Sequence, residues 1–349
     1  MSSFFSFLLF LLILSQSITM KTALLVAATA AVASANLTET QHQFLFTRFV
    51  ETHGKEYETK NFFAKYATFK DNLATILEHN AKADKTFTMG VTQFADMTAE
   101  EFANYSKLKP VGAGLRAKAA TKVNSFRVPS EVDWRKEGEV VGPVQDQGQC
   151  GSCWAFAAAA AVESANVLGG NKFVKLSEQQ LVDCAGGSYG NHGCNGGLMD
   201  LAYDYYNDKG AASLASYPYK ARDLSCSAST ADIVIPAKRF NGYEVVKQGS
   251  AALTAAIAQQ PVAVALAASG SAFQFYTGGI VTSNCGTQLN HGVFAVGYGT
   301  ENGVDYYIIR NSWGAGWGEK GYIRIQRGNN MCGVENHNWN AYPNFISKA

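Results

Sequence analysis

Residues 147–156 read QGQCGSCWAF, and an alanine-rich run continues from there to Val167, before Gly169-Gly170 interrupts it. The pattern predicts a helix that begins at Cys153 and ends at a glycine signal. At the start of a helix, the helix dipole and a nearby imidazolium stabilise a thiolate and can lower a cysteine pKa from about 8.5 to as little as ~3.5. This stretch therefore predicts a nucleophilic cysteine at position 153.

Composition restricts the kind of protein to which such a cysteine can belong. The chain has 349 residues, of which 47% are hydrophobic and 16% charged, with a formal net charge of +1. A chain this apolar can bury a large core, which excludes intrinsic disorder, and its near-neutral charge predicts no nucleic-acid partner. The number of cysteines, seven, is odd, so at least one thiol stays outside any disulfide within the chain.

A nucleophilic thiol needs a base, and the six histidines can be screened for one. His291 opens the strand-like run NHGVFAV at 290–296, where a glycine beside it gives access to the ring. Asn311, in the run NSWG, is a candidate to orient this imidazole. We therefore expect His291 to be the partner of Cys153. The screening sets aside His42, His53 and His79, which lie in a cysteine-free segment, and His192, which lies in a Gly/Asn loop.

The chain divides chemically near residue 128, because every cysteine follows that point. Residues 36–127 hold 13 Lys/Arg and 10 Asp/Glu, whereas residues 128–349 hold 15 and 18, so the net charges are +3 and −3. Both N-glycosylation triplets, at Asn36 and Asn104, lie in the first segment. The division predicts two functional parts of opposite charge.

The first 35 residues are predicted to be a targeting segment. Met20-Lys21, an apolar run and Ala33-Ser34-Ala35 form the pattern of a signal peptide that is cleaved after Ala35. The signal begins at Met1 or at Met20. Residues 1–19 are either an upstream extension of the signal or the result of a wrongly chosen start codon. A membrane anchor is the alternative, but neither apolar run reaches the ~20 residues that a stable span needs. We expect the secretory pathway, with an extracellular or lysosome/vacuole destination.

Helices are predicted first along the chain and strands later. Apolar residues recur at three- and four-residue spacing over 40–80, which predicts helix, and the Gly and Lys/Ala run over 112–122 indicates a flexible linker. This order predicts an α+β fold in two halves. The predicted strands are Val262–Leu266, Val293–Val296, Tyr306–Ile309 and Tyr322–Ile325.

Three further blocks follow QGQCGSCWAF: LSEQQLVDC with GCNGG at 176–197, LNHGV at 289–293, and NSWGAGWGEKGYIRI at 311–325. Together they resemble the papain family of cysteine proteases, and within it the cathepsin L-like branch, whose cysteine signature is followed by its histidine about 130–150 residues later. The resemblance implies a papain-like two-domain fold, with a helical left domain and a β-barrel-like right domain. The active-site cleft lies between them, and a mainly helical prodomain precedes them.

The cysteine-free segment resembles the family's inhibitory prosegment. GVTQFAD at 90–96 matches the motif GxNxFxD with Thr92 in place of Asn. The resemblance implies three parts: a signal peptide over 1–35, an inhibitory prosegment over 36–127 and a mature peptidase domain over 128–349. A second motif, ERFNIN, is matched along one helix face, with Asn and Lys at its first two positions, by Asn61, Lys65, Phe69, Asn72, Ile76 and Asn80.

By resemblance, four residues carry the chemistry. Cys153 attacks a peptide carbonyl as a thiolate paired with protonated His291, which then protonates the leaving amine and later activates water. Asn311 fixes the tautomer of His291, and Trp313 shields their hydrogen bond from water. The Gln147 side chain and the Cys153 backbone N–H stabilise the oxyanion, a role in which losing one donor typically costs about 10²–10³ in rate.

The resemblance also assigns disulfides and subsites. It implies the bridges Cys150–Cys194, Cys184–Cys226 and Cys285–Cys332, whereas six cysteines alone allow 15 connectivities. Gly196 and Gly197 are assigned to the substrate backbone. For Ala265, a member of the predicted S2 pocket, ordinary core packing is the alternative interpretation. The assigned side-chain subsites comprise Leu198, Met199, Ala265, Leu289, Asn290, Gly292 and Trp313.

The floor of S2 is predicted by counting from Cys332, which leads to His337, with Asn336 and Asn338 as alternatives. With an ordinary histidine pKa near 6.5, His337 in this place would make the P2 preference depend on pH. A surface histidine in a polar turn is the other interpretation.

The implied partners are protein and peptide substrates, the chain's own prosegment and cystatin-like inhibitors. The sequence has no dipeptidase-type occluding loop, which favours an endopeptidase, and we expect a monomer without cofactor or metal. Three other classes remain as hypotheses. CxxC at 150–153 suits a redox protein, but no βαβ pattern precedes it. Zinc-ligand spacing is not matched. An inactive, binding relative would not be labelled at a single cysteine by a thiol-directed epoxide.

Overall fold

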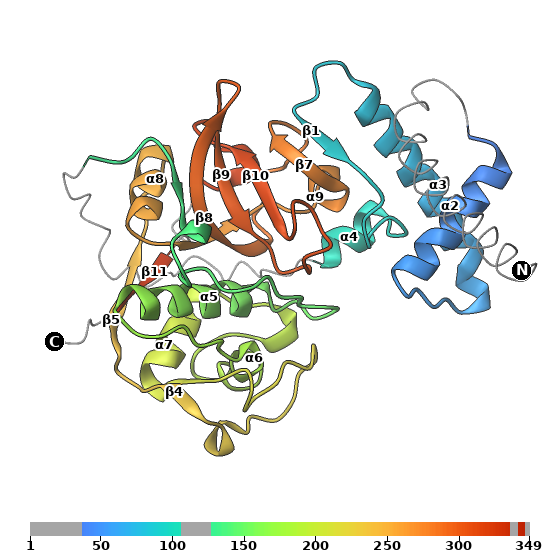
Figure 1. The fold of residues 1–349 in the computed structure, drawn as a ribbon. Coiled ribbons are helices and arrows are strands. Elements are labelled where there is room, and N and C mark those ends of the chain that lie inside the picture. The colour runs from blue at the N-terminus through green and yellow to red at the C-terminus, as the bar shows by residue number, and fades with distance from the viewer. Residues whose placement is uncertain (1–36, 106–126, 336–340, 346–349) are drawn as a thin grey trace, which may run out of the picture. The chain divides into compact units, whose positions relative to one another are not determined.

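The computed structural model describes residues 37–105, 127–335 and 341–345 (Figure 1). The chain forms two compact units, which divide after Lys85. The first unit contains the helices α2 (Glu39–Thr52) and α3 (Thr59–Ala81), and the second contains the sheet and the other described helices. The predicted signal peptide, Asn36, the linker over 112–122 and His337, with its alternatives Asn336 and Asn338, lie outside the described residues.

Aromatic packing joins the two helices of the first unit. The Phe46 ring lies 5.3 Å from the Phe69 ring and 6.1 Å from the Phe49 ring, and all three side chains are buried. The helical character predicted over 40–80 is confirmed, but it is divided between two helices, with an interruption between Thr52 and Thr59. At Gly54 the backbone takes a φ of +56°, which glycine adopts at little cost. The interruption lets the two helices pack their aromatic faces on each other.

A nine-stranded sheet forms the centre of the second unit (Figure 1). Its strands follow the order β1-β7-β10-β9-β8-β6-β11-β5, and β2 pairs with β8 beside this path. The path has two ends, so the half that was expected to be barrel-like is an open sheet. The bounds are β1 Phe87–Met89, β2 Val132–Asp133, β5 Phe240–Val245, β6 Val262–Leu266, β7 Tyr276–Val281, β8 His291–Glu301, β9 Val304–Arg310, β10 Tyr322–Gln326 and β11 Ala341–Phe345.

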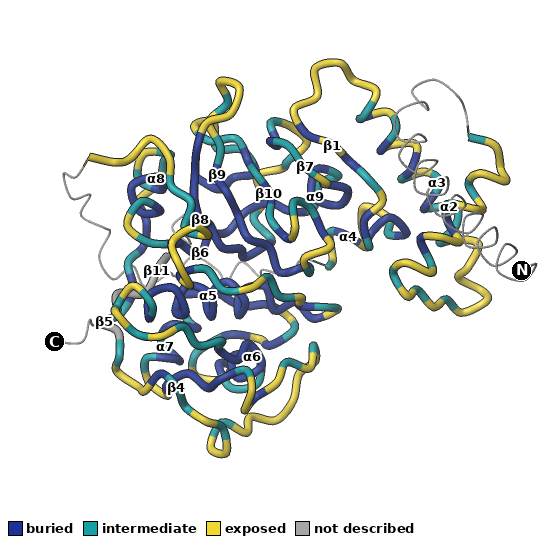
Figure 2. Tube along the Cα trace, viewed as in Figure 1, coloured by how far each residue is buried: buried dark blue, intermediate teal, exposed yellow. Residues whose placement is uncertain are grey.

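One helix connects the sheet to the helical half. Helix α5 (Cys153–Leu168) begins and ends where the sequence predicts, and it packs against β8, α6 and α7. Figure 2 shows α5 buried along most of its length, which its alanines permit because small side chains let neighbours approach closely. The other helices are α4 Ala99–Tyr105, α6 Glu178–Cys184, α7 Met199–Lys209, α8 Ser250–Gln259 and α9 Ser271–Gln274. A second sheet pairs β3 Ala211–Ala212 with β4 Ile233–Ile235.

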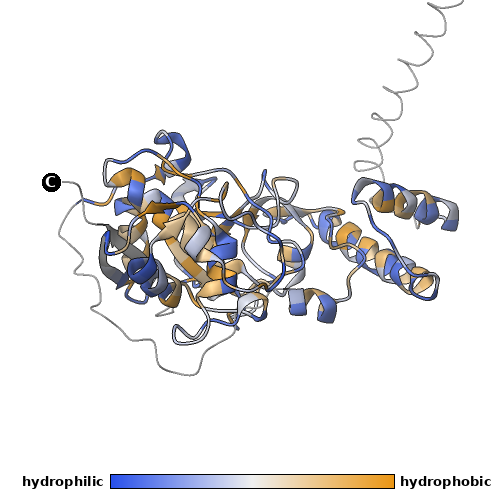
Figure 3. Ribbon diagram, turned by 90° about the horizontal axis from the view of Figure 1, so that it is seen from below, coloured by the Kyte–Doolittle hydropathy of each residue, from blue (hydrophilic) through white to orange (hydrophobic). Residues whose placement is uncertain are grey.

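The predicted α+β order of helices and strands is confirmed. All four predicted strand runs lie within strands, namely β6, β8, β9 and β10, and β8 and β9 extend beyond the predicted residues. Every residue of β6 is buried. Figure 3 shows hydrophobic residues along the interior strands of this unit and hydrophilic residues on its outer loops. Within the described ranges, no helix has both the length and the apolar character that a bilayer crossing requires.

Candidate active site

Cys153 lies at the junction of the helical half and the sheet. It is the first residue of α5, it is fully buried, and it is not part of a disulfide. The backbone N–H of Gly292, on β8, donates to Cys153 Sγ at 3.4 Å. A Cβ added to Gly292 would lie 3.4 Å from the backbone of Trp154, so glycine permits this close approach of strand to helix.

His291 is held by two neighbours from the sheet. Its Nε2 lies 2.8 Å from Asn311 Oδ1, which also accepts the Ser312 backbone N–H at 2.8 Å. Because an amide oxygen only accepts, Nε2 carries the proton, and in the neutral ring Nδ1 keeps its lone pair. Nδ1 is buried and hydrogen-bonds to no described residue. The ring stacks on Trp313 with centroids 4.8 Å apart. Nδ1 is thus the nitrogen left for a thiol proton.

Burial sets the protonation state of this histidine. Desolvation lowers the pKa of His291 to about 4, and the hydrogen bond to Asn311 opposes the shift without cancelling it. With an ordinary pKa near 6.5 the imidazolium would dominate below about pH 6, whereas this lowered pKa keeps the ring neutral above about pH 5. The described arrangement therefore holds a neutral His291 ring, whose unprotonated Nδ1 can accept a proton.

Gln147 is fixed at both ends of its side chain. Its Nε2 donates to the Cys150 carbonyl at 3.0 Å, and its Oε1 accepts from Ser312 Oγ at 2.7 Å. Its backbone N–H donates to the Ser312 carbonyl at 2.9 Å. The side-chain amide is therefore oriented before any substrate arrives. Sequence reasoning assigned no role to Ser312, and only its place in the NSWG run could have indicated one.

The predicted backbone-binding glycines precede α7. Gly196 has a φ of +107°, a backbone conformation that favours glycine. A Cβ on Gly197 would lie 2.3 Å from Asn191 Oδ1 and 2.7 Å from the Trp154 ring, so no side chain fits there. Asn191 Oδ1 also accepts the backbone N–H of Leu198 at 2.7 Å. This hydrogen bond holds the glycine loop against Trp154, the residue that follows Cys153.

The structure brings several predicted S2 residues together. A Cβ on Gly292 would lie 3.3 Å from Met199 Sδ, and Ala265 pairs with Gly292 in the β6–β8 register. Leu289 lies near Gly333 instead, since a Cβ on that glycine would lie 3.1 Å from the leucine. Asn290 has a structural task, because its Oδ1 accepts the Ala268 backbone N–H at 2.8 Å.

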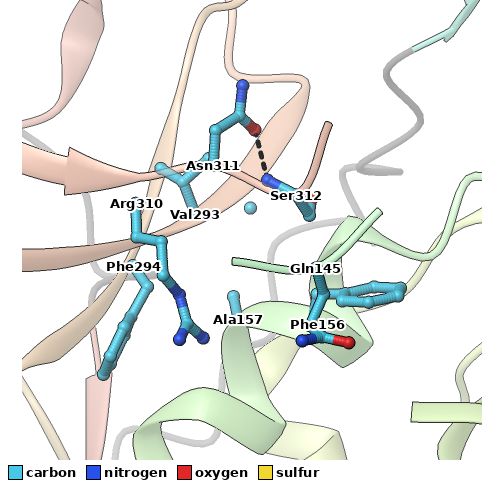
Figure 4. A pocket seen from close by; sticks show the side chains of 9 residues that line it. Gln145, Phe156, Ala157, Val293, Phe294, Arg310, Asn311 and Ser312 are labelled. Atoms are coloured by element: carbon cyan, nitrogen blue, oxygen red, sulfur yellow. Dashed lines mark hydrogen bonds between the residues drawn. The ribbon is translucent and has the colours of Figure 1, made fainter. Parts of the chain in front are cut away.

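A small cavity is lined in part by Asn311 (Figure 4). Figure 4 shows the Asn311–Ser312 hydrogen bond at one side and the Arg310 and Phe294 side chains at another. Arg310 is buried, lies 5.2 Å from the Phe294 ring centroid and donates to the Gly142 carbonyl at 2.8 Å. The lining residues are Gln145, Phe156, Ala157, Gly292, Val293, Phe294, Arg310, Asn311 and Ser312.

Trp313 forms the centre of an aromatic cluster that sequence reasoning missed. The rings of Phe94, Phe102 and Tyr105 lie 5.1, 5.6 and 5.8 Å from it. These three come from the predicted prosegment, and Gln93 Nε2 donates to the Trp313 carbonyl at 2.8 Å. The GxNxFxD match at 90–96 contains Phe94 but gave no indication of its contact with Trp313.

Hydrogen bonds attach the same part of the prosegment to the sheet. Strand β1 pairs antiparallel with β7, and Thr92 Oγ1 donates to the Gln274 carbonyl at 2.5 Å. Gln274 Nε2 in turn donates to the carbonyls of Phe94 and Met97 at 3.0 and 2.8 Å. Thr in place of the motif's Asn thus still makes a buried hydrogen bond.

The described residues form three disulfides: Cys150–Cys194, Cys184–Cys226 and Cys285–Cys332. They are the pairs that the resemblance implies. Among the described residues, no group of three or more His, Cys, Asp or Glu side chains is arranged to hold a metal ion.

Known proteins are similar to this chain in sequence. Residues 128–342 match the papain family cysteine protease domain, and residues 46–102 match the cathepsin propeptide inhibitor domain. The chain is 46% identical over 289 residues to vignain of Ricinus communis, which covers 77% of each chain. It is 43% identical to the probable cysteine protease RD21B of Arabidopsis thaliana, over 83% of this chain and 64% of that relative. It thus spans less than two thirds of RD21B.

Solved structures match across both units. Digestive procathepsin L 3 of the Tenebrio molitor larval midgut is 39% identical with a TM-score of 0.78, over 87% of this chain and 99% of that chain. The ragweed pollen allergen Amb a 11, a cysteine protease solved in its proform, is 38% identical with a TM-score of 0.79, over 89% and 97%. These matches confirm the expected papain-like fold. The chain therefore belongs to the papain family of cysteine proteases and carries a cathepsin propeptide inhibitor domain ahead of its peptidase domain.

Proposed function

We propose that this chain is a cysteine endopeptidase made as a zymogen, in which Cys153 and His291 form the reactive pair. The observation that supports it most is the Gly292 N–H at 3.4 Å from Cys153 Sγ, because Gly292 directly follows His291 in the chain. Asn311 holds the distal nitrogen of the same ring at 2.8 Å. The constellation of nucleophile, base and orienting group is that of nucleophilic catalysis.

The reaction follows from these groups. The thiolate attacks the peptide carbonyl carbon, a C–S bond forms, and negative charge collects on the carbonyl oxygen. The Gln147 amide and the Cys153 backbone N–H stabilise that charge. The C–N bond then breaks, and the imidazolium of His291 gives its proton to the leaving amine. Water, whose proton passes to His291, cleaves the thioester and restores the thiolate.

The prosegment over 36–127 is the proposed inhibitor. Its residues 92–105 contact Gln274 and Trp313, and the Trp313 ring is the one that stacks on His291. The propeptide inhibitor domain supports the same role. We place the maturation cut near Val128-Pro129, just before β2, where both residues are exposed.

The setting is the secretory pathway, with an extracellular or lysosome-like destination. Support comes from the targeting pattern over 20–35 and from three disulfides, which persist in oxidising compartments. Asn104 is exposed on α4 and accessible to glycosylation. Proteins and peptides are the substrates, cystatin-like proteins are further inhibitors, and the enzyme acts as a monomer.

Replacing Cys153 by Ala tests this function. The variant should give a folded, full-length proenzyme without peptidase activity, because only the nucleophile is removed. Fluorogenic peptides with Leu or Phe at P2, assayed after acid treatment, measure the activity, and near-UV circular dichroism checks the fold. Hydrolysis by the variant at the wild-type rate would show that the nucleophile is another group. A wild-type protein that stays inactive after its prosegment is removed would make the chain a binding relative.

A further inference from the structure

The two proposed oxyanion donors lie on separate pieces of backbone. Gln147 belongs to the turn before Cys150, and the Cys153 N–H belongs to the first turn of α5. A tetrahedral oxyanion needs both donors within about 2.7–3.1 Å, and a 1 Å misplacement can cost about 10²-fold in rate. Ser312 orients the Gln147 side chain, as described above. Something else must hold the Gln147 backbone relative to the helix.

The Tyr219 hydroxyl lies between these two pieces. It donates to the Gln147 carbonyl at 2.8 Å and lies 2.6 Å from Ser152 Oγ. A phenol has one proton to donate, so Ser152 Oγ is the donor in the second contact. The result is a relay from Ser152 through Tyr219 to the Gln147 carbonyl. Gln147 and Ser152 are fully buried, so water is not at hand to replace either bond.

Ser152 behaves unusually for its position. It is the N-cap residue of α5, where serine normally accepts a hydrogen bond from a backbone N–H of the first helical turn. Here its side chain makes no such cap bond. Its hydroxyl is directed to Tyr219 instead, so it does not compete for the helix N–H groups that face the reacting carbonyl.

Packing holds the Tyr219 ring in place. The ring lies edge-on to Phe156, one turn into α5, with centroids 4.9 Å apart. The next residue, Lys220, donates its backbone N–H to Gln179 Oε1 at 2.8 Å. Burial, above all, raises the pKa of Tyr219 above its usual range, so its hydroxyl keeps the donor proton at every pH at which such an enzyme works.

We propose that Tyr219 is a positioning residue for the oxyanion hole, which ties the Gln147 backbone to the start of α5 through its hydroxyl. This inference rests on the proposed function of Cys153 and Gln147. Tyr219 touches neither substrate nor reacting atoms. It acts through Gln147 and Ser152. Its loss should therefore weaken stabilisation of the transition state, in which negative charge develops on the carbonyl oxygen, and leave substrate binding unchanged.

The test uses Tyr219→Phe, which keeps the ring and its packing on Phe156 and removes only the hydroxyl. With the activated full enzyme, kcat should fall about tenfold with KM changed less than about twofold, since transition-state contacts alone are affected. The matched control is Tyr217→Phe, on the same segment. The Tyr217 hydroxyl donates to Asp183 Oδ2 at 2.8 Å and makes no contact with the oxyanion donors. It should keep wild-type kcat.

Three measurements separate positioning from general damage. Alkylation of Cys153 by iodoacetamide forms no oxyanion, so its rate should be unchanged in Tyr219→Phe. A peptide aldehyde, which forms a tetrahedral adduct, should bind about tenfold more weakly. Combined with Gln147→Ala, the tyrosine variant should cost almost nothing further, because both act through one amide.

Equal losses of alkylation and hydrolysis, or additive losses with Gln147→Ala, would overturn the proposal. If Tyr219→Phe does not fold, Ser152→Ala removes the other end of the relay. It should lower kcat severalfold while sparing alkylation, and unchanged hydrolysis would overturn the proposal equally. A wild-type enzyme with no Cys153-dependent hydrolysis would refute the proposed function itself, which is a distinct result.

Discussion

Replacement of Lys175, a mostly buried lysine of the helical half, is expected to lower the stability of the fold strongly. Its ammonium group lies 2.7 Å from Glu163 Oε1 and also contacts Glu178, and both glutamates are almost fully buried. The Oε2 atoms of both carboxylates are buried without a hydrogen-bond partner in the described structure. One ammonium thus serves two buried carboxyl groups. Lys175→Met keeps most of the side-chain volume and leaves the carboxyls without a cation.

The magnitude follows from this burial. Removing one partner of a buried ion pair typically costs about 3–5 kcal/mol. For a domain of 150–250 residues, each kcal/mol shifts Tm by about 2–4 °C, so a Tm loss of about 6–20 °C is expected at pH 7.

The pH dependence has a defined sign. Burial, with Glu163 nearby, raises the pKa of Glu178, and this outweighs the lowering effect of Lys175. A group with a raised folded-state pKa stabilises the fold below its unfolded pKa, and that stability is lost as pH rises through the folded value. Without the ammonium, the Glu178 carboxyl binds its proton still more tightly. The Tm loss should therefore be smaller at pH 5 than at pH 7.

The assay is thermal unfolding of the full proenzyme in a Cys153→Ala background, which prevents self-digestion. Lys238→Met is the matched control, because its ion pair with Asp208 is exposed and such pairs contribute about 0–1 kcal/mol. The reasoning is refuted if Lys175→Met loses no more Tm than Lys238→Met, or if its loss is greater at pH 5 than at pH 7.

Two further predictions concern the site and its inhibitor. Asn311→Ala should lower kcat/KM by about 10²-fold through misorientation of the imidazole. Since the Asn311 bond raises the pKa of His291, the upper limb of the pH–rate profile should move to lower pH, and an unmoved limb would contradict the assigned hydrogen bond. Phe94→Ala in a separately made prosegment should weaken inhibition at least a hundredfold, because large-to-small replacement of a buried Phe typically costs about 3–5 kcal/mol. Val91→Ala, at an exposed position of the same motif, should leave the inhibition constant nearly unchanged, and equal effects would contradict the Trp313 cluster.

Local signals sufficed where one segment determines the structure. The start of α5 at Cys153 and its end at Gly169 follow from alanines, a dipole-favoured terminus and glycine, all within the helix itself. The place of His291 at the start of β8, and of Asn311 directly after β9, follows from short β-type runs. The interruption near Gly54 was missed because the apolar spacing continues across it, and only the packing of Phe46 on Phe69 requires two helices.

Contacts between distant segments were beyond such reasoning. The cluster around Trp313 joins residues 94–105 to residue 313, and no sequence pattern in either segment predicts a contact with the other. The contacts of Lys175 with Glu163 and Glu178, and the Tyr219 relay to Gln147, likewise depend on how the loops pack. Motif resemblance identified the reacting residues, whereas the residues that hold them became visible only in three dimensions.

The central claim is that Cys153 is the activated nucleophile, and covalent labelling tests it most directly. The acid-activated protein is treated with an irreversible epoxide inhibitor of thiol proteases, and the modified peptide is identified by mass spectrometry. We predict one label per chain, on the peptide that contains Cys153, with loss of activity in proportion to labelling and little labelling of the intact proenzyme. Labelling at another residue, or full activity after Cys153 has been modified, would contradict the account.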